Sequence, residues 1–396
     1  MIPDAHLPSS GSLPAGKVLI APDKFKGSLT AAEVAARVAA GLARGGFGGE
    51  TVPLPVADGG DGTVAAAVSA GFRRVELGVR GPLGKNVTAA YALRDDTAVI
   101  EAAQACGLSL LPPGDLAPLT ATSRGVGELI LMARRMGAKR IVLGVGGVAT
   151  TDGGAGLLQA LGARLTDDSG FELPPGGGAL TRLAHLDLRR LRDLSGVEFV
   201  LASDVNNPLL GPSGAAAVYG PQKGASAEDV ELLEAGLRRW ADVAEAAVPG
   251  AASSAAGQLT RDAPGAGAAG GLGFAALLFL GARMRPGIDM LLELASFESR
   301  LDEARLVITG EGSLDAQSLH GKAPVGVAHA AAAHDPAVPV VAVAGRCTLT
   351  EGELRAAGIA RAYALTDLEP DIERCVADAG PLVERLAERI AADWLG

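Results

Sequence analysis

Short apolar runs alternate with helical patterns at both ends of the chain. Five of these runs are rich in β-branched residues and have the length of buried parallel strands: residues 17–21, 51–57, 306–310, 338–345 and 362–365. Between the first two, Thr30 and Glu33 form a capping-box pattern that predicts a helix from residue 31 to about residue 43. The later runs alternate with helical stretches at residues 324–334, 349–357 and 372–393. This alternation predicts an α/β fold with one doubly wound parallel sheet built from both chain ends.

The pattern between these two groups of runs is different. Residues 73–79, 87–93 and 98–102 have strand character and are separated by short, hairpin-like turns. Two further strands are predicted at residues 140–144 and 198–202. We therefore expect a mixed α/β domain, with a partly antiparallel sheet, inserted into the doubly wound one.

The expected domain boundaries follow from these two patterns. The doubly wound domain is discontinuous and comprises residues 17–72 and 298–396, and the inserted domain comprises residues 73–297. Residues 1–16 lack the basic and apolar regions of a signal peptide and are expected to be a disordered leader. The Ala-, Gly- and Ser-rich residues 249–257 are interpreted as an internal linker or mobile loop. We expect the active site in the cleft between the two domains.

Composition and charge narrow the classes of function. Hydrophobic residues make up 48% of the 396 residues and charged residues 20%, which is typical of a folded chain with a sizeable core. The net charge of −10 argues against nucleic acid and acidic membrane surfaces as partners. Residues 263–282 are uncharged but contain Gly and Pro, so they predict a loop and a buried helix, and not a membrane span.

Cysteine and histidine usage bears on location and on metal chemistry. Cys106, Cys347 and Cys375 are scattered, odd in number and without a C-x-x-C pair, which favours a reducing, cytoplasmic location. The five histidines lack metal-ligand spacing, so a histidine-bound zinc site is not expected.

Glycine-rich segments that carry Asp, Glu or Lys follow several predicted strands. Lys24 and Lys26 come after the first strand, and Asp58 comes after the second. Each segment alone is compatible with an ordinary loop or turn, although strand ends and helix N-termini of this kind also bind anions. Their repetition indicates a phosphate- and metal-handling site assembled from many loops. The other such segments are residues 144–156, 203–209, 220–224, 270–273, 286–289 and 309–324.

Seven of these motifs, taken in order, resemble the bacterial glycerate kinase family, and the resemblance runs from Lys17 to about Trp394. It implies a flavodoxin-like domain made from both chain ends, with a second α/β domain inserted. It also implies ATP- and Mg²⁺-dependent phosphorylation of D-glycerate, giving 2-phospho-D-glycerate, with 3-phosphoglycerate as the alternative product. The motifs are APDKFKGSLTA from Ala21, PVADGGDGT from Pro55, GVGGVATTDGGAG from Gly144, GPQKGA from Gly220, GAAGGLG from Gly267, PGID from Pro286 and TGEGSLDAQSLHGKAP from Thr309.

Phosphoryl transfer requires an in-line hydroxyl, neutralised phosphate oxygens and a carboxylate that receives the proton. On this basis we expect Asp58, or failing that Asp289, to accept the proton, with Lys24 as a further catalytic residue. Mg²⁺ would be held by carboxylates drawn from Asp152, Asp204, Glu311 and Asp315. Substrate and phosphate would be bound by Lys26, Gly59, Gly60, Gly146, Gly147, Thr150, Lys223, Gly270, Gly271 and Lys322.

Two other functions stay open at this point. A non-catalytic sensor would close on a small hydroxy acid without nucleotide or Mg²⁺, and the repeated acidic loops favour catalysis over it. A kinase acting on another small polyol acid would share the site chemistry and differ only in the shape of its pocket. The substrates are small molecules in either kinase hypothesis, and a homodimer remains open as the assembly state.

Overall fold

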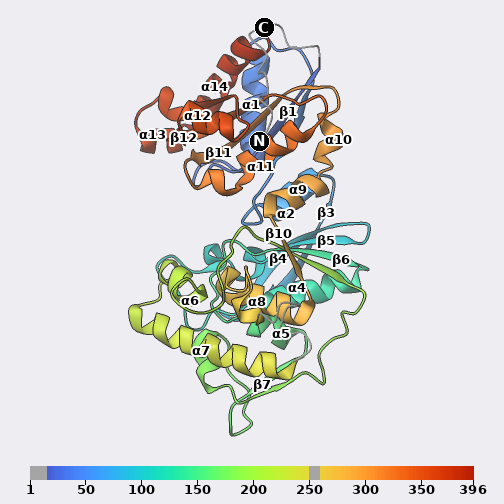
Figure 1. The fold of residues 1–396 in the computed structure, drawn as a ribbon, viewed down its shortest axis with the longest axis vertical. Helices are drawn as coiled ribbons and strands as arrows, with labels where there is room; N and C mark the ends of the chain where they lie inside the picture. The colour runs from blue at the N-terminus through green and yellow to red at the C-terminus, as the bar shows by residue number, and fades with distance from the viewer. Residues whose placement is uncertain (1–15, 249–258) are drawn as a thin grey trace. The chain divides into compact units, whose positions relative to one another are not determined.

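Five parallel strands from the two ends of the chain form one sheet (Figure 1). The computed structural model describes residues 16–248 and 259–396. The order of the sheet is β13-β12-β11-β1-β2, which is the flavodoxin-like order and confirms the predicted fold class. Its strands are β1 (Lys17–Pro22), β2 (Thr51–Pro53), β11 (Ala304–Leu314), β12 (Val340–Cys347) and β13 (Arg361–Ala364).

The second predicted strand is shorter than its apolar run. β2 ends at Pro53, because Pro53 and Pro55 lack the N–H groups that a ladder needs. Even so, the amides of Leu54 and Val56 donate to the carbonyls of Ile20 and Pro22, at 2.8 and 3.0 Å. The chain therefore continues beside β1 as far as the glycine-rich segment after Ala57.

Helices cover both faces of this sheet. Val18 and Ile20 of β1 pack with α1 (Ala31–Arg44) and α14 (Ala379–Trp394), whereas the alternate residue Leu19 packs on the side of α11 (Ala323–Ala333). The predicted capping box is present, since the Glu33 amide donates to the Thr30 hydroxyl at 3.2 Å and the Thr30 amide to the Glu33 carboxylate at 2.8 Å. The remaining helical segments are α10 (Phe297–Leu301), η5 (Ser318–His320), α12 (Glu351–Ala356), η6 (Leu365–Asp367) and α13 (Ile372–Ala377).

A six-stranded mixed sheet forms the second part of the structure. Its order is β10-β9-β6-β5-β4-β3; the β3–β4 and β4–β5 pairs are antiparallel and the other pairs are parallel, as predicted for a partly antiparallel sheet. A separate two-stranded sheet joins β7 (Arg164–Thr166) to β8 (His185–Asp187). The strands of the mixed sheet are β3 (Arg73–Arg80), β4 (Asn86–Arg94), β5 (Thr97–Glu101), β6 (Arg140–Gly144), β9 (Glu198–Ala202) and β10 (Arg283–Arg285).

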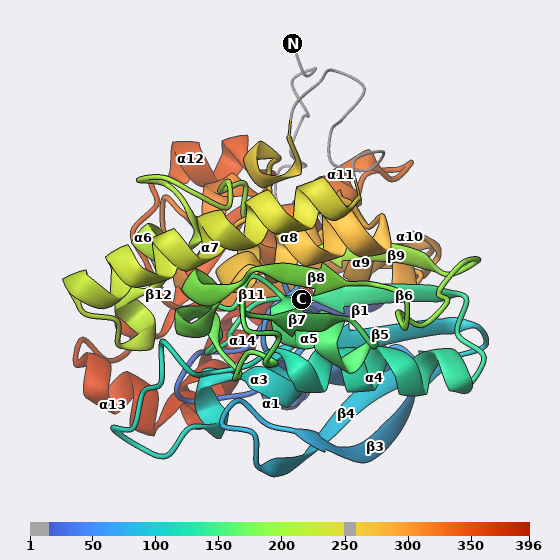
Figure 2. The same cartoon turned by 90° about the horizontal axis from the view of Figure 1, so that it is seen from below.

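The core beside this sheet is built on two long helices. α7 (Ala227–Ala247) and α8 (Ala268–Leu280) both contribute buried residues to it (Figure 2). The Trp240 ring of α7 stacks on Phe279 and meets the edge of Phe274, both in α8. α8 is the buried helix expected in residues 263–282. No helix within the described residues is long and apolar enough to cross a membrane. The shorter segments are α3 (Ala103–Cys106), η1 (Leu108–Leu110), α4 (Arg124–Arg135), α5 (Ala155–Ala160), η2 (Gly177–Arg182), α6 (Ala215–Tyr219), η3 (Pro221–Lys223) and η4 (Thr260–Asp262).

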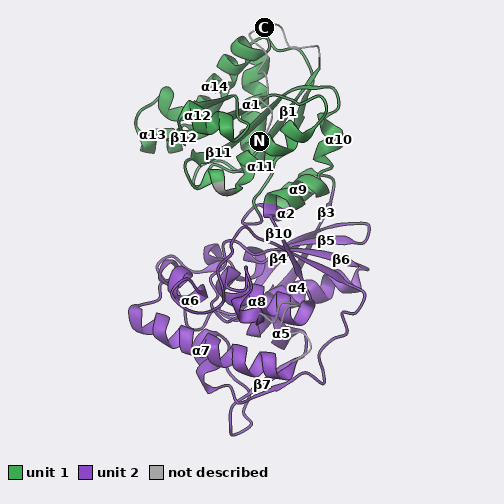
Figure 3. Ribbon diagram, viewed as in Figure 1, with its two compact units in different colours: residues 1–58, 65–71, 288–396 green, residues 59–64, 72–287 purple. Residues whose placement is uncertain are grey.

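The chain divides into two compact units (Figure 3). Unit 1 comprises the residues up to Asp58, Ala65–Gly71 and Ile288–Gly396, and unit 2 comprises Gly59–Val64 and Phe72–Gly287. The chain passes between the units four times: after Asp58, after Val64 in α2 (Thr63–Ser69), after Gly71, and after Gly287 at the start of α9 (Gly287–Leu294). Except for Gly16, the leader and the linker predicted from the sequence lie outside the described residues.

Candidate active site

A cluster of carboxylates and lysines lies at the carboxyl ends of β1, β2 and β11 in unit 1. Asp23 directly follows β1 and is only 8% exposed. Burial raises the pKa of Asp23 to about 6; Lys24, whose ammonium is 3.8 Å from the carboxylate, acts against this rise, and the charge of Asp58 adds to it. Asp23 was not predicted as a site residue, although it directly precedes Lys24 in the same motif.

Glu311 and Asp315 extend this cluster from β11 and the loop that follows it. Glu311 is buried and accepts a hydrogen bond from the Ser318 hydroxyl. Burial raises the pKa of Glu311 to about 7; the Ser318 bond and Lys322 act against the rise, whereas Asp23 and Asp315 reinforce it. The Asp315 carboxylate accepts from the Gln317 amide at 2.9 Å. The structure thus brings together six acidic and basic residues of unit 1, five of them predicted: Asp23, Lys24, Asp58, Glu311, Asp315 and Lys322.

In unit 2, two glycine-rich segments pack against each other at the carboxyl ends of β6 and β9. The Gly146 amide donates to the Gly59 carbonyl at 3.3 Å. A Cβ atom at Gly146 would lie 2.5 Å from the Gly60 Cα atom, and one at Gly59 would lie 2.7 Å from the Ala202 carbonyl oxygen. Glycine is needed at these positions because the two backbones approach too closely for side chains.

Glu101 holds the first of these segments and was missed in the sequence. It ends β5, is 3% exposed, and accepts a hydrogen bond from the Val64 amide at 3.0 Å. Burial raises its pKa, against the effect of the bonds from the Val64 and Gly62 amides. The sequence feature that could have indicated this role is a single acidic residue, Glu101, at the end of an otherwise apolar run.

Three residues predicted as phosphate or metal ligands lie in the interior of unit 2. Asp152 is 1% exposed and accepts four hydrogen bonds, from the Ser123 amide and hydroxyl at 2.8 and 2.9 Å and from the Gly154 and Gly156 amides at 3.1 and 3.2 Å. Thr150 is fully buried, and its carbonyl accepts from the Lys223 ammonium at 2.6 Å. The ammonium is enclosed as well, because Lys223 is 2% exposed.

The other predicted residues are more dispersed. Gly270 and Gly271 adopt left-handed φ angles of 66° and 87° in a kink of α8, with Gly270 close against the Thr150 carbonyl. Asp204 is exposed and accepts from the Gly287 amide at 3.1 Å. Asp289 lies in the first turn of α9, with an exposed side chain, and Lys26 is exposed in the loop after β1.

The predicted metal ligands come from both units. Glu311 and Asp315 belong to unit 1, whereas Asp152 and Asp204 belong to unit 2. Across residues 16–248 and 259–396, no group of three or more His, Cys, Asp or Glu side chains is arranged to hold a metal ion. Any metal held by these carboxylates would therefore need oxygen ligands from the substrate or from water.

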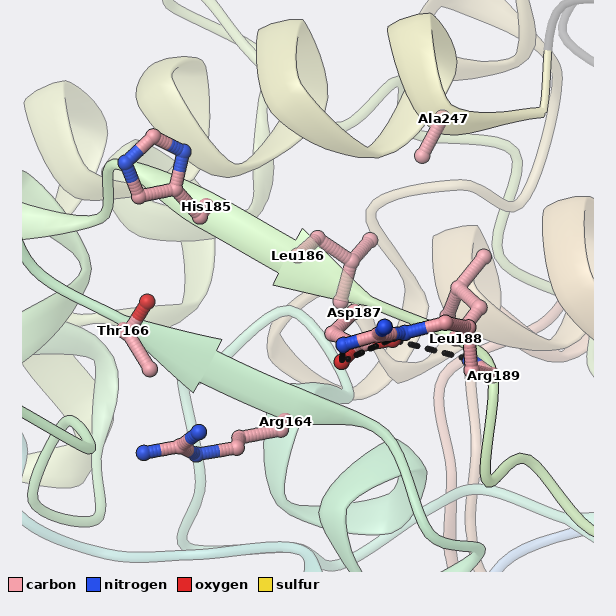
Figure 4. A pocket seen from close by; sticks show the side chains of 8 residues that line it. All are labelled: Arg164, Thr166, His185, Leu186, Asp187, Leu188, Arg189 and Ala247. Atoms are coloured by element: carbon pink, nitrogen blue, oxygen red, sulfur yellow. Dashed lines mark hydrogen bonds and ion pairs between the residues drawn. The ribbon is translucent and has the colours of Figure 1, made fainter. Parts of the chain in front are cut away.

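A pocket of about 580 Å³ lies elsewhere on unit 2, beside β7 and β8 (Figure 4). Arg189 forms an ion pair with Asp187 there, at 2.6 Å. The pocket contains none of the predicted site residues. It is lined by Arg164, Thr166, His185, Leu186, Asp187, Leu188, Arg189 and Ala247.

A flavodoxin-like unit and a mixed α/β unit, each with polar loops at the carboxyl ends of parallel strands, define an α/β protein of the kind that binds small ligands at those strand ends. The model of the glycerate kinase family matches residues 18–395, so the chain belongs to the glycerate kinase family. This confirms the resemblance seen in the motifs, and it makes the chain a kinase.

Relatives and a solved structure agree with this assignment. A glycerate kinase of Bacillus subtilis is 46% identical over 380 residues, which cover 95% of this chain and 97% of the relative. A glycerate 2-kinase of Escherichia coli is 41% identical, with coverage of 95% and 97%. A crystal structure from Salmonella typhimurium LT2, described as glycerate kinase 2, has a TM-score of 0.80 and 40% identity, and the match covers 96% of this chain and 98% of that one.

Proposed function

We propose that the chain transfers a phosphoryl group from ATP to the 2-hydroxyl of D-glycerate. The observation that carries this proposal is the cluster in unit 1, where buried carboxylates and lysines meet at the carboxyl ends of parallel strands. Such a cluster combines cationic groups for anionic substrates with carboxylates whose pKa suits proton transfer. The Escherichia coli relative is a glycerate 2-kinase, which supports the choice of the 2-hydroxyl.

Proton removal is assigned to Asp58, with Asp289 as the alternative. Asp58 lies close enough to Asp23 for the two charges to interact, in the same cluster as Lys24 and Lys322. The Asp58 carboxylate can accept the proton of the substrate hydroxyl. The lysines would hold that hydroxyl in place by binding the carboxylate of the substrate. Asp289 is exposed on α9 and is kept as the second candidate.

Anion binding is assigned to lysines and to backbone amides. Lys322 precedes α11, whose N-terminal amides and dipole favour negative charge, and Lys24 and Lys26 lie in the loop after β1. In unit 2, Gly147 is the exposed residue of the second glycine-rich segment, whereas Gly146 is half-buried and its amide already donates to the Gly59 carbonyl. The Gly147 amide is therefore the candidate donor to a phosphate in this segment.

The donor chemistry of unit 1 fits Mg²⁺. This ion takes one or two carboxylates and completes its octahedron with phosphate oxygens and water, so a cluster of three acidic residues is not required. Glu311 and Asp315 lie near each other and supply such carboxylates, and Asp204 is a further candidate in unit 2. Asp152 does not fit, because both of its oxygens already accept internal hydrogen bonds. When bound, the ion would neutralise charge on the transferred phosphate.

Phosphorus NMR of the product tests the proposal directly. Purified protein, ATP, Mg²⁺ and D-glycerate should yield 2-phosphoglycerate. Formation of 3-phosphoglycerate would keep the kinase and overturn the position of transfer. Binding of D-glycerate without any phosphorylated product would instead favour the non-catalytic sensor.

A further inference from the structure

Lys223 is a buried lysine that donates a hydrogen bond to a backbone carbonyl. It ends the short η3 segment, is 2% exposed, and donates from Nζ to the Thr150 carbonyl at 2.6 Å. Burial lowers its pKa to about 8, and the neighbouring Asp152 and Cys106 act in the opposite direction. Burying an ammonium group is unfavourable unless hydrogen bonds and charges compensate, so a lysine in this place needs a structural or functional reason.

The Thr150 carbonyl belongs to the second glycine-rich segment, residues 144–156, and other groups hold the same stretch. The Trp240 indole N–H donates to the Gly153 carbonyl at 2.9 Å, and the Gly153 amide donates to the Gly270 carbonyl at 3.0 Å. Lys223 ends η3 and Trp240 lies within α7, so two successive helical elements each bind one carbonyl of the segment. These carbonyls point into the interior of unit 2.

The part of the segment that faces outward is short. Within residues 144–156, only Gly146 and Gly147 reach solvent, and the others are buried. Gly146 packs on Gly60, and Gly147 has a φ of 72° and faces the Asp61 carboxylate. Fixing Thr150 and Gly153 from the inside therefore fixes the base from which Gly146 and Gly147 extend.

We propose that Lys223 is a positioning residue for phosphoryl transfer: it anchors the Thr150 carbonyl and thereby orients the Gly146–Gly147 turn, without contacting substrate or phosphate. This inference rests on the proposed function. Direct phosphate binding is disfavoured by the enclosure of the ammonium and by its short bond to Thr150. The role also differs from the phosphate contact that the sequence alone predicted for Lys223.

Lys223→Met tests the anchor, because methionine keeps much of the side-chain volume but has no donor for the Thr150 carbonyl. Hydrogen exchange of the full-length protein should become about 10-fold faster or more in peptides that cover residues 144–156. The kcat should fall by about 10- to 100-fold, as expected for a displaced reacting group, with the KM for D-glycerate within about twofold. Lys223→Gln, which retains a donor, should restore part of the exchange protection and of kcat.

Two further variants separate this role from general destabilisation. Lys139→Met removes an exposed lysine of the same unit and should change neither exchange in residues 144–156 nor kcat. Trp240→Phe removes the N–H that holds Gly153 and should also accelerate exchange in the segment without removing a positive charge. If Lys223→Met fails to fold, Lys223→Gln still decides the question, through exchange in residues 144–156 and kcat compared with the wild type.

The opposite result is equally clear. If Lys223→Met leaves exchange in residues 144–156 unchanged and raises the KM for ATP, Lys223 contacts the nucleotide and the inference is overturned. If the wild-type protein does not phosphorylate D-glycerate, the proposed function fails. The exchange measurements then still show whether Lys223 anchors the segment, so the two failures are distinguishable.

Discussion

The amide of Val64 donates a hydrogen bond to the carboxylate of Glu101 at 3.0 Å, at the point where α2 begins. This bond ties the Gly59–Val64 segment to the end of β5 in unit 2. The Thr63 hydroxyl closes the same turn by donating to the Gly60 carbonyl at 2.6 Å. The shape of this glycine-rich segment is therefore set by one buried carboxylate and one buried hydroxyl.

Glu101→Ala should destabilise the protein by about 1–3 kcal/mol, because the buried Val64 amide loses its acceptor. Chemical denaturation of the wild type and the variant measures this difference. Glu231→Ala, an exposed change on α7, is the control and should stay within about 0.5 kcal/mol of the wild type. Equal stabilities for Glu101→Ala and the wild type would show that the segment does not depend on Glu101.

Asp58→Asn tests the assignment of the proton acceptor. The change keeps the size of the side chain but removes its basicity, so kcat should fall at least about 100-fold while the protein stays folded. Steady-state kinetics with ATP and D-glycerate give kcat, and circular dichroism checks the fold. Asp289→Asn is the matched comparison. Near wild-type turnover in Asp58→Asn together with a large loss in Asp289→Asn would transfer the role to Asp289.

The buried thiol of Cys106 should make stability depend on pH in the alkaline range. Burial raises the pKa of Cys106 from its ordinary value of 9.0 to about 12. Between these values the folded protein keeps a proton that the unfolded chain releases, so the stabilising contribution is complete below pH 9 and declines as the pH rises towards 12. Cys106→Ser removes this titration and keeps a donor for the Ala102 carbonyl, which the thiol contacts at 3.3 Å.

The measurement is the difference in unfolding free energy between the wild type and Cys106→Ser at several pH values. Below pH 9 the difference should be constant. Above pH 9 the wild type should lose stability relative to the variant, by at most about 1.4 kcal/mol per pH unit. A difference that stays flat up to pH 11 would mean that the thiol ionises as readily in the folded state as in the unfolded chain.

The sequence predicted the fold well because its strongest signals are local and periodic. The Thr30–Glu33 capping box and the apolar run at residues 17–21 each specify an element through neighbours in the chain. β10 was not predicted, since its three residues, Arg283–Arg285, carry two charges and show no alternation of their own. The flavodoxin-like order followed from the resemblance and agrees with the observed sheet.

The site was predictable as a set of loops but not as a set of side-chain directions. Lys223 and Asp152 lie in motifs of the right composition, yet both side chains turn inward and bind backbone groups of unit 2. Spacing along a glycine-rich loop does not report which side chains face a ligand, because left-handed glycines can redirect the chain at each step. Glu101 was missed because it stands alone at the end of an apolar strand and belongs to none of the glycine-rich motifs.

Gly146→Ala tests the close packing of the two glycine-rich segments. The new Cβ atom would lie 2.5 Å from the Gly60 Cα atom, and because that neighbour is backbone, one of the two segments must move. We expect a loss of about 1–3 kcal/mol in stability from overpacking and a decrease in kcat of about 100-fold from displacement of the turn.

Gly78→Ala on β3 is the control, since a Cβ atom there meets nothing within 4 Å and the residue has no positive φ. Alanine should be neutral or slightly stabilising at Gly78. If Gly146→Ala matched this control in both stability and kcat, the contact between Gly146 and Gly60 would not be required for the active conformation, and the proposed role of the Gly146–Gly147 turn in phosphate binding would lose its structural basis.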